Sequence, residues 1–179
     1  MQTIYYDNGY IVPPMSVEKI HNLARAIRIM NADCIDESGR IDIMAVLEFN
    51  NIHYSYKPDE EMGQILGLTM SNGDIFLRES IGDGAIIGDG RSRFTVAHEL
   101  GHYAMHKDHI GLARPASSST KVYCNAEWQA NEFAGALLLP NELIIKNGHL
   151  SVEQLADKFG VSIECAQTRI NKLNKKSSY

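Results

Sequence analysis

The helix predicted for residues 93–106 constrains this chain most, because its sequence, RFTVAHELGHYAMH, contains His-Glu-x-x-His. One helical turn separates His98 from His102, and their directions differ by about 40°, so both imidazoles can reach one metal ion. Glu99 projects at the edge of the same arc. Two nitrogen ligands beside a carboxylate that can take a proton from water are typical of a catalytic zinc site. The alternative is an amphipathic helix with incidental histidines.

A second helix is predicted from Glu127 to Pro140, because proline cannot continue a helix. The segment between His102 and Glu127 is long enough for a loop and a returning helix. Glu127 is therefore a candidate third ligand, which would leave a fourth position for water, as catalytic zinc requires. The alternative is a carboxylate that is simply favoured near the positive end of the helix dipole.

Two neighbours of Glu127 in this helix bear on the site. Asn131 lies one turn on and could accept a hydrogen bond from the second ring nitrogen of a ligand histidine. Glu132 is a rival ligand, but it lies about 140° around the helix from Glu127, so both cannot face one metal ion.

The flanking sequence predicts further helices and a small sheet. Periodicity and capping predict helices from Ser16 to Met30 and from Ile41 to Phe49. Alternating apolar residues predict a strand at 52–57. Asn72-Gly73 predicts a hairpin of strands at 64–70 and 74–78, because both turn residues accept positive φ. We expect a mostly antiparallel sheet packed on the His-Glu-x-x-His helix, with strand 74–78 offering an edge to an extended peptide.

Three other stretches are predicted to lack regular structure. Residues 1–14 are expected to form a loose arm that ends at two prolines. The glycine-rich stretch Ile81–Gly90 is expected to be a flexible loop beside the cleft, since its two aspartates match no calcium-loop spacing. Ala116–Thr120, with three serines in a row, is expected to be another loop and a candidate mobile flap.

Residues 151–174 predict two helices joined around Gly160, an arrangement that resembles a helix-turn-helix. The second of these helices carries one Arg and one Glu before a basic end made by Lys172, Lys175 and Lys176. We therefore expect a packing element or a surface that docks a partner, and no direct DNA binding. Binding of DNA through this helix pair is kept as an alternative.

Composition excludes several broad classes. The net charge of -5 argues against non-specific binding of nucleic acid by the whole surface. No apolar run approaches the roughly 20 residues of a transmembrane helix, and the first residues do not resemble a secretory signal. Three widely spaced cysteines, Cys34, Cys124 and Cys165, are typical of reduced and mostly buried thiols in a cytoplasmic protein.

The two motif-bearing helices resemble the ImmA/IrrE family of bacterial and phage metallopeptidases. Residues 93–103 are close to the first motif of that family, and the second is matched by Glu127-x-x-Ala130-Asn131-x-Phe133-Ala134-x-x-Leu137-Leu138-x-Pro140. Leu139 stands where the family usually has Met. The resemblance covers roughly residues 60 to 145, and two linked motifs are more specific than one.

The resemblance implies a zincin-like α+β fold with one zinc ion per chain. It implies that His98, His102 and Glu127 hold the metal and that Glu99 is the general base. His106, Tyr103 and Asn131 are candidates for the outer shell, with plain solvent-facing positions as the alternative for His106 and Tyr103. We expect a peptidase domain at residues 1–145 and a packed helical appendage at 146–179.

Members of this family cleave a helix-turn-helix repressor encoded nearby. The resemblance therefore implies a cytoplasmic zinc endopeptidase that acts on such a repressor of a phage, a mobile element or a stress response. Its longer members carry a C-terminal sensor domain, for which we expect no room in 179 residues. The alternative is a non-proteolytic regulator that keeps the metal and grasps its partner, as a toxin grasps its antitoxin.

Overall fold

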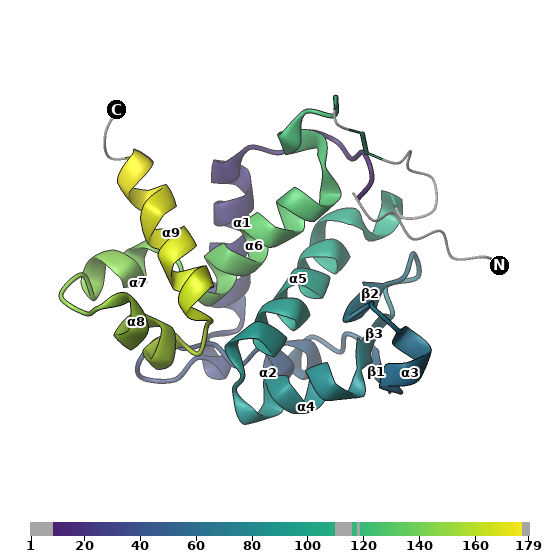
Figure 1. Cartoon of the computed structure of the whole chain (residues 1–179), viewed down its shortest axis with the longest axis horizontal. Coiled ribbons are helices and arrows are strands. Elements are labelled where there is room, and N and C mark those ends of the chain that lie inside the picture. Colours follow the sequence, from purple (N-terminus) through teal and green to yellow (C-terminus); the bar gives the residue numbers. More distant parts are fainter. Residues whose placement is uncertain (1–8, 110–115, 118, 177–179) are drawn as a thin grey trace.

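The computed structural model describes residues 9–109, 116–117 and 119–176, which form an α+β structure (Figure 1). Its helices are α1 (Val17–Met30), α2 (Ile43–Phe49), α3 (Asp59–Met62), α4 (Glu79–Ile87), α5 (Gly90–His106), α6 (Ala126–Leu138), α7 (Asn141–Lys146), α8 (Val152–Phe159) and α9 (Ile163–Lys176). Its strands are β1 (Tyr54–Lys57), β2 (Gly67–Thr69) and β3 (Ile75–Arg78), and short 3-10 turns cover Ala32–Cys34, Lys107–His109 and Val122–Cys124. Within the described residues, no helix is long and apolar enough to cross a membrane.

Capping side chains set the starts of several helices. Ser16 accepts a hydrogen bond from the backbone N–H of Lys19 at the start of α1, and Asp42 caps α2 in the same way. Ser151 and Gln154 form a reciprocal capping box at α8. Each cap satisfies backbone donors that a helix leaves without an internal partner, so local sequence is enough to place these boundaries.

The sheet is mixed, which corrects the prediction of a mostly antiparallel one. Its strand order is β1-β3-β2. β2 pairs with β3 in the antiparallel sense of the expected hairpin, but β1 pairs with β3 in parallel, with Tyr54 opposite Ile75. The short helix α3 and β2 lie between β1 and β3 in the chain, so the chain can return to pair β3 alongside β1 in the same direction.

This order also corrects the predicted substrate edge. β3 is paired on both of its sides and offers no free edge, whereas β2 is an edge strand and packs against α5. The turn before β3 has Gly73 at φ 91°, while Asn72 does not take positive φ and instead accepts a hydrogen bond from the backbone N–H of Asp74. The predicted hairpin is present, with one left-handed turn residue instead of two.

The glycine-rich stretch predicted as a flexible loop is largely the helix α4. A Cβ at Gly82 would clash with the ring of Tyr56, and one at Gly84 would clash with the side chain of Ser92. These glycines therefore let α4 approach β1 and α5 closely. A glycine inside a helix costs about 1 kcal/mol relative to alanine, and this tertiary packing offsets that cost.

α5 and α6 lie side by side at the centre of the molecule, with the sheet on one side and α7–α9 on the other (Figure 1). Their close approach depends on Gly101, where a Cβ would lie 3.0 Å from the ring of Phe133 and 3.3 Å from the Cα of Ala130. The absence of a side chain at Gly101 thus allows α6 to pack directly on α5.

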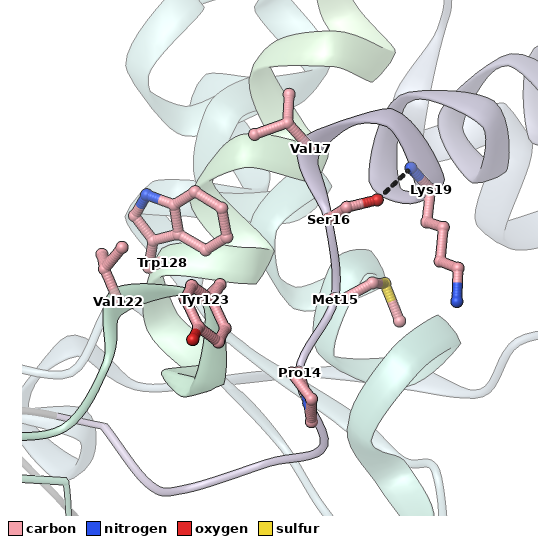
Figure 2. A pocket seen from close by; sticks show the side chains of 8 residues that line it. All are labelled: Pro14, Met15, Ser16, Val17, Lys19, Val122, Tyr123 and Trp128. Atoms are coloured by element: carbon pink, nitrogen blue, oxygen red, sulfur yellow. Dashed lines mark hydrogen bonds between the residues drawn. The ribbon is translucent and has the colours of Figure 1, made fainter.

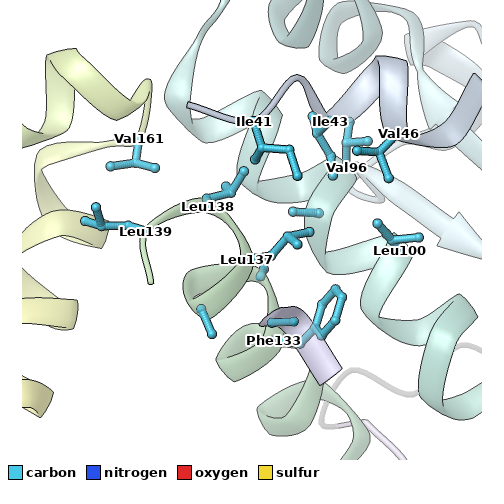
Figure 3. Close-up of a cluster of buried hydrophobic side chains, with 14 of the residues drawn as sticks. Ile41, Ile43, Val46, Val96, Leu100, Phe133, Leu137, Leu138, Leu139 and Val161 are labelled. Atoms are coloured by element: carbon cyan, nitrogen blue, oxygen red, sulfur yellow. The ribbon is translucent and has the colours of Figure 1, made fainter. Parts of the chain in front are cut away.

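A single large core joins these two helices to α2, the sheet and the C-terminal part (Figure 3). The labelled side chains come from four parts of the chain and are all buried: Ile41, Ile43, Val46, Val96, Leu100, Phe133, Leu137, Leu138, Leu139 and Val161. Burying a side chain of this size contributes roughly 1.5–3 kcal/mol, so the core holds α5 and α6 in place without help from a bound ion.

The turn between the C-terminal helices α8 and α9 packs on the start of α5. The buried guanidinium of Arg93 donates to the backbone carbonyls of Phe159, at 2.8 Å, and of Ile41, at 2.5 Å. A Cβ at Gly90 would clash with the backbone of Val161, so helix and turn are in direct contact. The lone arginine of α9, Arg169, is 3% exposed and is therefore not available to DNA.

The N-terminal segment is not a loose arm from residue 9 onward. Tyr10 and Val12 are buried against Ala126, and Ile11 forms a β-bridge with Asn125. Farther along, Pro14 and Met15 border a surface hollow of about 550 Å³ with Tyr123 and Trp128 (Figure 2). Residues 1–8 of the predicted arm, and part of the predicted flap at 116–120, lie outside the described residues.

Candidate metal centre

Helices α5 and α6 bring together the three residues that the sequence analysis singled out. Nε2 of His98 lies 3.0 Å from Nε2 of His102. The two carboxylate oxygens of Glu127 lie 3.1 Å from Nε2 of His98 and 3.2 Å from Nε2 of His102. All three ligand-type atoms therefore converge on one point between the helices.

These separations fit a tetrahedral zinc ion. With metal–ligand bonds of about 2.0–2.1 Å, neighbouring ligands of a tetrahedral ion lie about 3.3 Å apart. Nε2 of His98 and Nε2 of His102 lie 3.0 Å apart, and each lies 3.1–3.2 Å from a different carboxylate oxygen of Glu127, so all three side chains can reach one ion. The histidines are largely buried, whereas the side chain of Glu127 is 39% exposed, so an open position for water or substrate lies on the side of Glu127.

The charge on Glu127 suits a cation. Burial alone would raise the pKa of this carboxyl, but the imidazoles of His102 and His98 outweigh it and hold the pKa well below its usual range. For His98, burial favours a lower pKa, while Glu127 and Glu99 raise it. The surroundings therefore keep the carboxylate ionised, which is the form that binds a metal.

Asn131 supports His98 as predicted. Its Oδ1 lies 3.0 Å from Nδ1 of His98, on the opposite side of the ring from the nitrogen that faces Glu127. An acceptor at this position favours the tautomer whose proton is on Nδ1 and leaves Nε2 free for a metal.

Glu99 is held by the edge strand β2. The hydroxyl of Thr69 lies 2.7 Å from Oε2 of Glu99 and 3.0 Å from its backbone carbonyl, and both residues are buried. A Cβ at residue 67 would lie 2.7 Å from Cγ of Glu99, so only glycine leaves room for this side chain. Sequence analysis missed both β2 residues, because nothing in a short strand marks which helix residue it will contact.

Tyr10 reaches the centre from the N-terminal segment and was also missed. Its hydroxyl lies 3.5 Å from Nδ1 of His102, and its ring stacks on that imidazole with the planes 26° apart. Burial raises the pKa of the phenol, and the charges of Glu127 and Glu99 raise it further, so Tyr10 is a neutral hydroxyl that can donate a hydrogen bond. Gly9 beside it packs on Glu127, where a Cβ would lie 2.7 Å from Cγ.

The two remaining outer-shell candidates lie in different places. His106 is 1% exposed, and its Nδ1 is 3.0 Å from Nδ1 of His102, so the solvent-facing alternative is wrong. Tyr103 packs on the hairpin turn at Gly73, and the ammonium group of Lys107 lies 4.5 Å from the centre of its ring. These contacts place Tyr103 at the sheet and not beside the three converging side chains.

Glu132, the rival ligand, points away from the histidines. It is buried between α1 and α9, where it pairs with His21 at 2.8 Å, with Arg169 at 3.2 Å and with Lys172. These partners outweigh burial and lower its pKa to about 2. The separation of the two glutamates around the helix is thus what the helical geometry predicts, with Glu127 on the side of the histidines.

Comparison with protein-family models finds a match that covers the two helices of the candidate site. Residues 88–171 match the peptidase M78 model, described as the IrrE N-terminal-like domain. This segment contains α5, α6 and most of the C-terminal helices. Neither the curated proteins nor the solved structures contain a significant match to the chain.

Proposed function

We propose that this chain, whose residues 88–171 belong to the IrrE N-terminal-like family of M78 peptidases, is a zinc-dependent endopeptidase that inactivates a transcriptional repressor. The family supports a metallopeptidase with a protein substrate. The observation that carries the choice of site is the convergence of His98, His102 and Glu127 at separations that suit a tetrahedral ion. We propose one zinc ion per chain at this point.

The proposed chemistry follows from the side chains around this point. A zinc ion, when bound, would polarise the scissile carbonyl and make the attacking water more acidic. Glu99 would take the proton of that water as general base and pass it to the leaving amine. Thr69 orients the carboxylate of Glu99 for this task. Tyr10 stacks on His102, and its hydroxyl lies next to Nδ1 of that ring, so it would help to hold this ligand in place.

An extended substrate strand would pair with β2, the free edge next to α5. Such pairing requires exposed backbone donors and acceptors, which a folded helix or sheet does not offer. We therefore propose cleavage in a linker or a locally unfolded segment of the target. The target that we propose is a cytoplasmic helix-turn-helix repressor encoded nearby, docked on the helix pair α8–α9.

The test of the activity is incubation of the zinc-loaded protein with the neighbouring repressor and with casein as an unrelated unfolded protein. We expect one specific cut in the repressor and none in casein. Glu99→Gln keeps the shape of the side chain but cannot take a proton, so turnover should fall about 100-fold or more. An intact repressor held in a stable complex would favour the non-proteolytic regulator instead.

The test of the metal site is elemental analysis of three variants, His98→Ala, His102→Ala and Glu127→Ala. Each should lose stoichiometric zinc, because two protein ligands hold the ion poorly. Glu132→Ala is the matched control, since it removes a buried glutamate from the same helix. Tightly held zinc in all three ligand variants, or its loss only in Glu132→Ala, would refute the proposed ligands.

A further inference from the structure

We propose that Gln129 is a positioning residue of the metal centre: through His106 it fixes the tautomer of His102 and ties this ligand to the N-terminal segment. Gln129 lies on α6 and is fully buried. The inference rests on the proposed metal site, and it does not depend on peptidase activity. It concerns three side chains, His102, His106 and Gln129, that are linked by hydrogen bonds and lead away from the three converging ligand residues.

The series of hydrogen bonds begins at Nδ1 of His102, the ring nitrogen that does not face the candidate metal site. Nε2 of His102 faces His98 and Glu127, so a metal ion would take that nitrogen and the ring proton must be on Nδ1. Nδ1 of His102 lies 3.0 Å from Nδ1 of His106. Since two neutral nitrogens in a hydrogen bond share one proton, Nδ1 of His106 is the acceptor and its own proton is on Nε2.

The side-chain oxygen of Gln129 accepts the hydrogen bond from Nε2 of His106. Nε2 of His106 lies 2.9 Å from Oε1 of Gln129, an oxygen that can only accept. His102 and His106 are both almost fully buried, so water does not compete for this bond at either ring. The side-chain oxygen of Gln129 therefore selects one tautomer of His106, and His106 in turn selects one tautomer of His102.

The orientation of the Gln129 amide is set by two backbone carbonyls. Its Nε2 donates to the carbonyl of Pro13 at 3.0 Å and to the carbonyl of Tyr123 at 2.8 Å. Carbonyls cannot donate, so a flipped amide would place its oxygen against two acceptors and leave both bonds unmade. An unmade buried hydrogen bond costs about 1–3 kcal/mol, which is enough to hold the amide one way round.

The N-terminal segment therefore holds His102 at two points. The backbone carbonyl of Pro13 accepts a hydrogen bond from Gln129 and so holds the end of the hydrogen-bond series that starts at His102. Tyr10, three residues before Pro13, stacks directly on the imidazole of His102. His98, by contrast, needs only Asn131, which is on the same helix as Glu127. Outer-shell partners of a ligand histidine typically contribute 10- to 100-fold to metal affinity, and we expect an effect of this size for Gln129.

The experiment measures zinc affinity and histidine tautomers in Gln129→Met, which keeps the length of the side chain without donor or acceptor. Competition with a chromophoric chelator should show zinc binding 10- to 100-fold weaker than in the wild type. The control is Asn147→Leu, which removes another buried amide, bonded to Leu143 and Lys158 and not to the metal centre. Its zinc affinity should stay within about threefold of the wild type, since it has no link to the ligands.

A second measurement uses the wild-type protein without metal, so that it does not depend on the folding of any variant. Long-range ¹H–¹⁵N NMR at about pH 8 should show His106 protonated on Nε2, the nitrogen that faces the side-chain oxygen of Gln129. His106 protonated on Nδ1 would overturn the proposal. Unchanged zinc affinity in Gln129→Met, or an equal loss in Asn147→Leu, would do so too. A wild-type protein that binds no zinc would refute the metal site of the proposed function, while the tautomers would still decide the role of Gln129.

Discussion

Thr69 and Gly67 determine where the carboxylate of Glu99 lies. The hydroxyl of Thr69 donates to one carboxylate oxygen, and the missing side chain of Gly67 leaves space for the rest of the group. Both residues lie on the edge strand β2, which is also the strand that we propose to pair with a substrate. At the residue scale, the general base and the peptide would thus be positioned by the same three-residue segment.

Thr69→Val should therefore lower kcat while leaving zinc content unchanged. Valine has the shape of threonine but no hydroxyl, so Glu99 loses a hydrogen bond to its charged form, which is worth about 1.5–3 kcal/mol. We expect kcat to fall roughly 10- to 100-fold with a smaller change in KM. Steady-state kinetics with the intact repressor that we propose as substrate measure both constants.

Thr69→Ser is the matched control for this prediction, because it restores the hydroxyl and removes only a methyl group. Its kcat should return to within a fewfold of the wild type. Equal losses in the serine and valine variants would mean that packing of the methyl group, and not the hydrogen bond, supports Glu99.

Among the helices, α1, α6 and α9 are linked by the ion pairs of Glu132, which lies on α6. It accepts from His21 of α1 and from Arg169 and Lys172 of α9. Arg169 also donates to the carbonyl of Leu139 and to the side chain of Asn141, next to the start of α7. This cluster is the polar counterpart of the apolar core, and it lies away from the metal centre on the other side of α6.

The Glu132 cluster should make the protein sensitive to acid. The pKa of Glu132 is lowered from 4.5 to about 2 in the folded state, so its contribution is fully present above about pH 4.5. That contribution is lost as pH falls from about 4.5 toward 2, because in this range the unfolded state binds a proton at this carboxyl and the folded state does not. Between pH 6 and pH 2.5 the wild type should lose on the order of 2–3 kcal/mol more unfolding free energy than Glu132→Gln. Urea unfolding followed by circular dichroism at both pH values measures this difference.

Glu142→Gln is the comparison variant for the acid effect. Glu142 pairs with Arg25 at the surface, where both side chains are more than half exposed. Solvent screens such a pair, so this substitution should change the pH dependence by well under 1 kcal/mol. An equal effect from Glu142→Gln would show that general charge repulsion, and not the buried cluster, causes the loss in acid.

Across the whole molecule, the candidate metal centre is built on one continuous apolar core. The buried residues of α5 and α6 continue through α2 and the sheet to the turn between α8 and α9. Arg93 and Gly90 attach that turn to the start of the metal-binding helix. We still propose residues 146–179 as an appendage to the domain at 1–145, but one that packs tightly on it and would transmit docking of a partner to α5.

Removal of the metal should therefore lower the melting temperature without unfolding the chain. Free zinc at 100 times its dissociation constant stabilises the folded state by about 2.7 kcal/mol, which for a chain of this size corresponds to about 5–10 °C. Calorimetry with and without a chelator measures the shift, and far-ultraviolet circular dichroism should show the helices retained at 25 °C. In His98→Ala the chelator should have no effect. Loss of helix on chelation would mean that the ion is structural.

The sequence alone determined the parts of this protein that depend on neighbours in the chain. His98, His102 and Glu99 are related by one helical turn, so the periodicity of α5 predicted their arrangement. Helical periodicity likewise predicted that Glu127 and Asn131 lie on one face of α6 and Glu132 on another. Caps at Ser16 and Ser151 set helix starts for the same reason. The family resemblance pointed to the same segment, and residues 88–171 match the family model.

The residues that surround the candidate metal centre from distant parts of the chain follow from tertiary packing alone. Tyr10, Thr69 and Gln129 meet the metal-binding helix across 92, 30 and 23 residues of chain, and no periodicity relates such positions. The parallel pairing of β1 with β3 is equally non-local. Glycine disfavours a helix, so the local sequence predicts a loop where α4 is found. Close packing of α4 on Tyr56 and Ser92 requires those glycines and stabilises the helix instead. Long-range packing decides these features because its energy depends on contacts that a local pattern does not contain.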